Sequence, residues 1–133
     1  MISKFRVWNK ATKEMYEADD IASLNFEKKQ ICVKTLFFGQ LNYYDFDDIV
    51  LMQSTGLKDK NGKEIFEGDI LTNGIDVMSI KRHDTLGFYI DFKGKIEFVA
   101  DGADLKEFEE DAKEIANNIE IIGNIYKNPE LIE

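Results

Sequence analysis

The sequence predicts an α+β protein, mostly β, with a small barrel in its C-terminal half, an N-terminal hairpin extension and one amphipathic helix. Short runs rich in aliphatic and aromatic residues follow one another closely between residues 53 and 99. Turn residues separate these runs, and a single apolar stripe at helical spacing follows them at about residues 104–117. Short strands at close spacing with tight turns favour a small barrel.

The length and hydrophobic content fit one ordinary core with attachments. The chain has 133 residues, of which 44% are hydrophobic, and a chain of this size can bury a core without disulfides. We divide it into a β-rich extension and oligomerisation region, residues 1–52, and a barrel with an inserted helix, residues 53–133. The single cysteine, Cys32, lies between Ile31 and Val33, so we expect a reduced thiol packed within a strand.

The N-terminal half reads as a hairpin followed by short strands. Residues 4–7 form an extended run, residues 9–13 form a polar turn, and residues 14–16 form the returning run. Between residues 21 and 50 the clearest β-like run is Ile31–Phe38. For the N-terminal half, the sequence therefore predicts β structure alone.

Two sharp turns stand in the middle of the chain. Asn61-Gly62 is a strong hairpin signal, because both residues tolerate the positive φ of a type I′ turn. Gly68 is expected at positive φ in a second reversal, which Asp69 helps to shape. We predict that these residues have structural roles and that four aliphatic residues fill the barrel: Leu57, Ile65, Ile70 and Ile122.

One helix is predicted after the barrel strands. Asp104 is suited to the N-cap, with Glu107 three residues later as a capping box. The apolar stripe that should lie against the sheet consists of Leu105, Phe108, Ala112, Ile115 and Ala116. Residues 119–126 then read as a last strand, and residues 128–131 as a terminating turn.

The net charge of −9 is placed mostly at the C-terminal end. Residues 99–133 hold ten acidic and three basic side chains, a net charge of −7. Binding to a phosphate backbone draws on clustered Lys and Arg, and the basic residues here form no cluster larger than the pairs Lys28-Lys29 and Lys81-Arg82. The composition therefore disfavours nucleic acid and an anionic membrane surface as partners.

Three segments carry a resemblance to a known family. They are Phe5-Arg6-Val7-Trp8-Asn9-Lys10 with Lys13-Glu14-Met15, the central Met52–Ile70 stretch, and Ile122-Gly123-Asn124-Ile125-Tyr126 with Asn128-Pro129-Glu130-Leu131. Together they resemble the YopX family of small proteins from phages and prophage-like elements. One departure is Ser54, at a position where the family pattern has an aromatic residue.

The resemblance implies an SH3-type small barrel decorated by additional strands and a helix, and assembly into homo-oligomers. It implies no activity and therefore no catalytic residue to map. With no apolar run of signal-peptide length in residues 1–10, we expect a soluble protein in the cytoplasm of a bacterial host.

The residues that could support chemistry are few. His83 is the only histidine, and residues 59–64 lack the ligand spacing of a calcium loop. No phosphate-binding glycine motif or nucleophile elbow is present. We therefore expect no catalytic, cofactor-binding or metal-binding residues and predict that the protein is not an enzyme. The contrary hypothesis is a divalent-metal-dependent enzyme that uses Asp19, Asp20, Asp47 or Asp48.

Two pairs of consecutive aromatic residues suggest an interface. If their segments are extended, Phe37-Phe38 and Tyr43-Tyr44 each place one ring on either face of a strand. One ring of each pair would then lie outside the core of a lone subunit, as at a contact surface. Burial under the N-terminal hairpin explains the same residues. Base stacking is a third explanation, which the acidic charge opposes.

These observations support three hypotheses of function. The first is a non-catalytic phage or prophage accessory protein, a homo-oligomeric protein-interaction or structural module that contacts itself or a host or phage protein. The second is an acidic mimic of nucleic acid that inhibits a host protein binding DNA or RNA, because of the charge of residues 99–133. The metal-dependent enzyme is the third.

Overall fold

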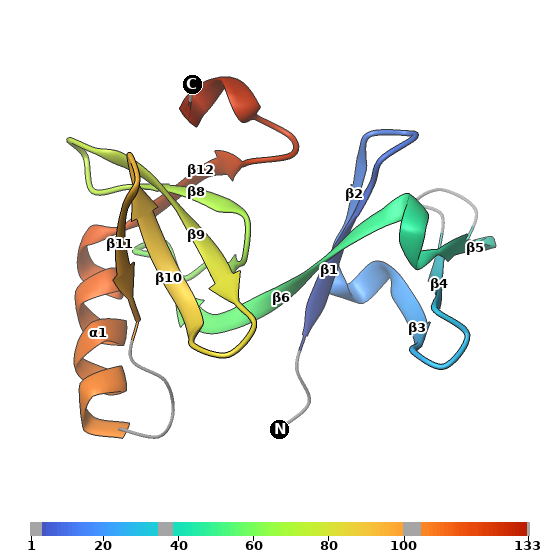
Figure 1. Ribbon diagram of the computed structural model, residues 1–133, viewed down its shortest axis with the longest axis horizontal. Helices are drawn as coiled ribbons and strands as arrows, with labels where there is room; N and C mark the ends of the chain where they lie inside the picture. Colours follow the sequence, from blue (N-terminus) through green and yellow to red (C-terminus); the bar gives the residue numbers. More distant parts are fainter. Residues whose placement is uncertain (1–3, 35–38, 100–104, 133) are drawn as a thin grey trace. The chain divides into compact units, whose positions relative to one another are not determined.

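The fold is α+β and mostly β, as predicted. The computed structural model describes residues 4–34, 39–99 and 105–132. The chain divides into two compact units, Met1–Gln53 and Ser54–Glu133, which Figure 1 shows in ribbon form. The described residues contain one α-helix, and none of their helices is long and apolar enough to cross a membrane.

The described residues of the first unit form six strands, the last of which continues into the second unit. The elements are β1 (Phe5–Asn9), β2 (Glu14–Tyr16), the 3₁₀ helix η1 (Ala18–Asp20), β3 (Ile21–Asn25), β4 (Gln30–Lys34), β5 (Leu41–Asp45), the 3₁₀ helix η2 (Phe46–Asp48) and β6 (Ile49–Lys58).

The second unit adds the remaining strands and the helix. Its elements are β7 (Glu64–Phe66), β8 (Asp69–Thr72), β9 (Val77–His83), β10 (Gly87–Phe92), β11 (Lys95–Phe98), α1 (Leu105–Asn118), β12 (Glu120–Asn124) and the 3₁₀ helix η3 (Pro129–Ile132).

The predicted N-terminal hairpin is confirmed. β1 pairs with β2 and, on its other side, with the first half of β6. Asn9 closes the turn, because its Oδ1 accepts the backbone N–H groups of Ala11 at 3.0 Å and Thr12 at 3.2 Å. A side chain that imitates a backbone acceptor in this way favours a tight reversal.

A second sheet in the first unit has the order β3-β4-β5. Ile31 and Val33 of β4 are fully buried and pack with Val7, Tyr16 and Ile49 in the core of this unit. Cys32 between them is buried too, as the sequence predicted. The end of the predicted Ile31–Phe38 run, residues 35–38, lies outside the described residues.

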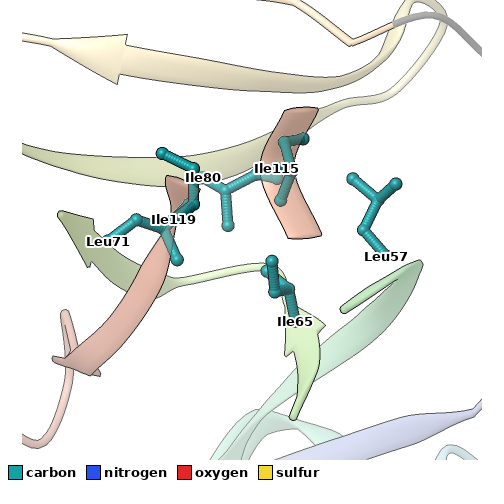
Figure 2. Packing of buried hydrophobic residues seen from close by; sticks show 6 residues of the cluster. All are labelled: Leu57, Ile65, Leu71, Ile80, Ile115 and Ile119. Atoms are coloured by element: carbon teal, nitrogen blue, oxygen red, sulfur yellow. The ribbon is translucent and has the colours of Figure 1, made fainter. Parts of the chain in front are cut away.

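The second unit is built on a curled antiparallel sheet with the order β11-β10-β9-β8-β12, which forms a half-barrel. Burial of aliphatic side chains between this sheet and α1 provides the main stabilisation of such a unit. Figure 2 shows the buried cluster, whose members come from β6, β7, β8 and β9, from α1 and from the residue before β12: Leu57, Ile65, Leu71, Ile80, Ile115 and Ile119.

The helix is confirmed, with one correction to its apolar stripe. Phe108, Ala112 and Ile115 pack on the core as predicted, but Ala116 is exposed. At 100° per residue, Ala116 lies about 80° around the helix from Phe108, at the margin of the stripe. The proposed N-cap, Asp104, lies outside the described residues, as does the side chain of Leu105.

The last strand contains a bulge that overturns one predicted core position. Leu57, Ile65 and Ile70 are buried as expected, whereas Ile122 is 37% exposed. The register of β12 against β8 shifts between Ile121 and Gly123, so Ile122 has no partner on β8. A bulge places an extra residue in the strand and leaves that residue out of the regular pairing.

Candidate functional site

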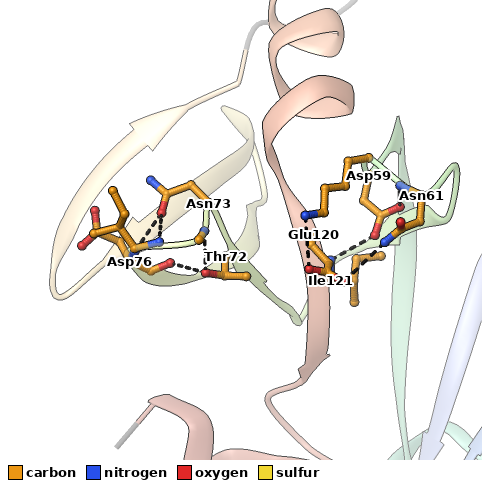
Figure 3. Close-up of polar contacts among 10 residues, drawn as sticks. Asp59, Asn61, Thr72, Asn73, Asp76, Glu120 and Ile121 are labelled. Carbon is orange, nitrogen blue, oxygen red and sulfur yellow. Dashed lines mark hydrogen bonds and ion pairs between the residues drawn. The ribbon is translucent and has the colours of Figure 1, made fainter.

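Asp59 in the second unit is only 2% exposed, and both oxygens of its carboxylate accept hydrogen bonds. Its Oδ1 accepts the backbone N–H groups of Asn61 and Lys63, each at 2.9 Å. Its Oδ2 accepts the N–H of Ile121 at 3.0 Å, which joins the β6–β7 loop to β12 (Figure 3). Burial would raise the pKa of Asp59, but the N–H donors of Ile121, Lys63 and Asn61 bring it below its ordinary value.

The tip of the same loop makes further contacts with the start of β12. The backbone N–H of Lys60 donates to the carbonyl oxygen of Ile119 at 2.8 Å. The Lys60 Nζ lies 3.5 Å from the Glu120 carboxylate, and the Asn61 Nδ2 donates to the same group at 3.5 Å. The loop therefore holds together segments that are some sixty residues apart in the sequence.

The predicted type I′ turn at Asn61-Gly62 is wrong. Gly62 has φ of +79°, but Asn61 is not among the described non-glycine residues with positive φ, which are Lys13, Lys29 and Lys93. The N–H of Gly62 donates to the carbonyl of Asp59 at 2.9 Å, and the N–H of Asp59 donates to the carbonyl of Lys63 at 2.8 Å. The Asp59 side chain supports a longer loop in which only the glycine is left-handed.

Gly68 and Asp69 lie at the second reversal, between β7 and β8. Gly68 has φ of +87°, its N–H donates to the carbonyl of Ile80 at 2.7 Å, and its own carbonyl accepts the N–H of Ile125 at 2.8 Å. The buried Asp69 Oδ2 accepts the N–H of Phe66 at 2.9 Å, and its Oδ1 accepts from the Asn124 side chain at 3.4 Å. These bonds tie the turn to β9 and to the end of β12.

The position at which the family pattern departs has a polar contact instead. The Ser54 hydroxyl is hydrogen-bonded to the Glu64 carboxylate, across the pairing of β6 with β7.

Two of the four predicted interface residues can be placed. Tyr44 is half-buried and packs on the core of the first unit, with its ring centroid 6.4 Å from that of Tyr16. Tyr43 points the other way and is 66% exposed. Phe37 and Phe38 lie outside the described residues.

Each unit has an edge strand with exposed apolar side chains. β5 is the last strand of its sheet, and we call Leu41 and Tyr43, which share one face of it, the β5 edge. β11 is the last strand of the larger sheet, and its residues Lys95–Phe98, the β11 edge, are all exposed. In the described part of the chain neither edge has a further strand paired to it. Edges of this kind with apolar side chains are suited to contact with another chain.

The carboxylates of the metal-enzyme hypothesis lie on two short 3₁₀ helices, where some have structural roles. The Asp20 Oδ2 accepts the N–H of Glu17 at 3.2 Å, which completes a capping box at η1. Asp47 and Asp48 are exposed, and their carbonyl groups accept hydrogen bonds from Lys10. Within the described part of the chain, no group of three or more His, Cys, Asp or Glu side chains is arranged to hold a metal.

His83 lies at the exposed turn between β9 and β10. Its Nδ1 accepts the backbone N–H groups of Thr85 at 3.2 Å and Leu86 at 3.1 Å. The ring also lies 6.2 Å from the ring of Phe98, in an edge-to-face arrangement. The imidazole is therefore engaged in shaping the turn.

Two open grooves flank the larger sheet. One, of about 460 Å³, lies beside η3 and contains the ion pair between Lys81 Nζ and Asp91, at 3.0 Å. The other, of about 410 Å³, lies between α1 and the β10–β11 hairpin. Its lining is apolar in part, with Phe98 and four aliphatic residues, and polar in part, with Asn73, Asn118 and the acidic residues Glu97, Asp111 and Glu114. We call the second one the acidic groove.

Comparisons with known proteins agree with this fold. The chain is similar over its full length to protein EF1440 from Enterococcus faecalis, with 30% identity, a TM-score of 0.69 and 99% of that chain covered. The crystal structure of protein yopX from Bacillus subtilis is similar in fold, at 23% identity, a TM-score of 0.61 and full coverage of both chains. A search of curated proteins finds no match. The model of the YopX protein family matches residues 4–133, so the chain belongs to the YopX family.

Proposed function

We propose that this YopX-family protein is a non-catalytic accessory module of a phage or prophage, which self-associates and contacts other proteins in the cytoplasm of a bacterial host. The observation that carries the proposal is the exposure of large apolar side chains on open strand edges. Leu41 and Tyr43 on the β5 edge are 51% and 66% exposed, and Ile96 and Phe98 on the β11 edge are 56% and 42% exposed. Subunit contact removes such surface from water.

The use of the buried carboxylates supports the non-catalytic part of the proposal. Asp59 and Asp69 accept backbone N–H groups at loops, so their lone pairs are used in holding the fold. A carboxylate that serves as a general base needs a lone pair directed at a substrate. The competing metal-dependent enzyme predicts that magnesium or manganese raises the melting temperature. We expect no such shift, and a reproducible one would favour the enzyme.

The oligomeric state tests the proposal directly. Size-exclusion chromatography with light scattering should give a mass above that of the 15.4 kDa monomer at micromolar concentration. A monomer up to the highest soluble concentration would contradict self-association. Tyr43→Glu introduces a charge on the β5 edge, and its effect on the mass shows whether that edge takes part.

The acidic mimic of nucleic acid remains a second candidate because of the outer face of α1. Glu107, Glu109, Glu110 and Glu114 are all exposed on this helix, and a carboxylate row could occupy a basic groove. A pull-down from bacterial lysate at low salt tests it, with Glu109→Lys/Glu110→Lys as the matched variant. Recovery of a DNA- or RNA-binding protein by the wild type alone would favour the mimic, and equal recovery by both proteins would count against it.

A further inference from the structure

Among the described residues, the backbone of β11 is paired on one side only, with β10. The N–H of Val99 donates to the carbonyl of Phe88 at 3.0 Å, and Tyr89 lies opposite Phe98. Because hydrogen-bonding direction alternates along an antiparallel strand, Lys95, Glu97 and Val99 turn their backbone groups toward β10. The N–H and C=O groups of Ile96 and Phe98 therefore point to the open side of the sheet.

The side chains of β11 also divide between two faces. Glu97 lies opposite Ile90 and lines the acidic groove, on the side of α1, and Lys95 shares this face by alternation. Ile96 and Phe98 lie on the other face, where the ring of Phe98 is 5.3 Å from that of Tyr89. The edge thus offers one charged face and one apolar face.

We propose that the β11 edge pairs with the β11 edge of a second copy, antiparallel and centred on Ile96. The proposal rests on the self-association proposed above and names the surface that mediates it. In this register the two Ile96 residues face each other, and each Phe98 lies opposite Gly94 of the other copy. On the other face, each Lys95 lies opposite the other copy's Glu97.

Charge and shape complementarity select a second copy as the occupant. Opposite charges on directly facing residues stabilise an antiparallel strand pair. In the proposed dimer the contact between Lys95 and Glu97 occurs twice, because the two copies are related by two-fold symmetry. The second copy's Lys95 would also approach the acidic groove, which Asp111 and Glu114 line beside Glu97. Gly94 has no side chain, and a Cβ added to it would meet nothing within 4 Å, so no neighbouring group at that point opposes the approach of the second copy's Phe98.

Neighbouring registers are less favourable. Pairing centred on Glu97 would place two carboxylates directly opposite each other, which destabilises a strand pair. Short strands that carry a lysine are also protected against indiscriminate pairing. A strand that pairs with this edge should carry an acidic residue opposite Lys95. A second β11 strand does so, because its Glu97 lies opposite Lys95.

A charge exchange tests the register. The dissociation constant should be measured by sedimentation for the wild type, Glu97→Lys, Lys95→Glu and the double variant Lys95→Glu/Glu97→Lys. Each single variant creates two like-charge contacts and should weaken the association about tenfold. The double variant restores both pairs and should return to within about threefold of the wild type. Glu109→Lys, with the same charge change at an exposed position of α1, is the matched control and should have little effect.

The outcomes separate this inference from the proposed function. A monomeric wild type contradicts both. An oligomer that is insensitive to the single charge variants, or that Tyr43→Glu alone disperses, contradicts only pairing through β11. Single variants that dissociate without rescue in the double variant contradict the register centred on Ile96.

Cross-linking provides an independent measurement that does not depend on affinity. Ile96→Cys places two thiols on facing residues, whereas the native Cys32 is buried and should not compete. Mild oxidation should yield a covalent dimer much faster than with Glu109→Cys, the exposed control. Equal rates of cross-linking in the two variants would overturn the proposal.

Discussion

The Oδ2 atom of Asp59 lies 3.0 Å from the backbone nitrogen of Ile121, sixty-two positions later in the chain. The same carboxylate holds the loop that contains Asn61 and Lys63. One side chain therefore sets the geometry of the β6–β7 loop and fixes the start of β12 against it. Several measurable consequences arise from this bond and from the turns around it.

Replacing Asp59 with asparagine should destabilise the protein by about 2 kcal/mol or more. The amide has one acceptor oxygen in place of two, so at least one buried N–H loses its partner and the charge assistance disappears. Urea unfolding measures the loss. Asp84→Asn is the control. The Asp84 side chain is exposed, and its ion pair with Arg82 is a surface pair that contributes little to the free energy of unfolding. Equal stability of the two variants would show that the Asp59 bonds do not stabilise the fold.

The stability of the wild type should fall in acid in a way that depends on Asp59. The pKa of this group is lowered in the folded state, so its contribution is complete above the ordinary value of about 3.9 and is lost as the pH falls through the folded-state pKa. The slope of the unfolding midpoint against pH should be shallower in Asp59→Asn. Some slope should remain, because the pKa of Asp91 is also lowered, first by its hydrogen bond with Lys81.

Gly68→Val should cost roughly 1–3 kcal/mol, since a branched side chain is strained at positive φ. Gly68 has φ of +87° and is buried between bonds to Ile80 and Ile125. Gly74 also has a positive φ, of +95°, but it lies in an exposed loop, where an added Cβ would meet nothing within 4 Å. The loop can relax around a valine, so Gly74→Val should lower the stability less than Gly68→Val. Thermal unfolding compares the two. A Gly68→Val protein as stable as the wild type would refute the strain at this turn.

Gly123→Ala tests the contact between β12 and the C-terminal turn. An added Cβ would lie 2.7 Å from the Asn128 Oδ1 and 2.9 Å from the Leu131 Cδ1, so these side chains must move, at a cost of about 1–3 kcal/mol. Displacement of Asn128 would also break its hydrogen bond from the N–H of Asn124, at 3.2 Å.

A double-mutant cycle with Asn128→Ala identifies the cause of that loss. Once Asn128 is displaced, removing its side chain should cost less in the Gly123→Ala background than in the wild type. Additive losses would show that the two residues do not interact and would place the strain elsewhere.

Local patterns predicted the elements that depend on nearby residues. The hairpin of β1 and β2 and the stripe Phe108, Ala112 and Ile115 follow from alternation and helical spacing, and both are confirmed. The expectation that Ile122 fills the barrel is wrong, because this residue lies in a bulge that depends on the pairing of β12 with β8. The SH3-type closure that the resemblance implies stays a prediction.

The roles that depend on distant partners could not be predicted. The sequence does not distinguish Asp59 from other charged residues near turns. Its partner Ile121 is distant in the sequence, and only the fold brings the two residues together. An aspartate two residues before a glycine-containing turn was the available signal, since such side chains often accept backbone N–H groups within the loop. The open edge of β11 was also beyond local patterns, because the order of strands in a sheet is a property of the whole unit.

Strand β6 belongs to both compact units: its Gln53 pairs with Phe5 in the first, and its Ser54 pairs with Phe66 in the second. The junction is therefore a continuous strand in place of a linker. Recombination at this point would leave each product with a truncated sheet, whereas shuffling at a true linker leaves both modules intact. Exchange of gene segments between relatives should for this reason transmit the fold only as a whole.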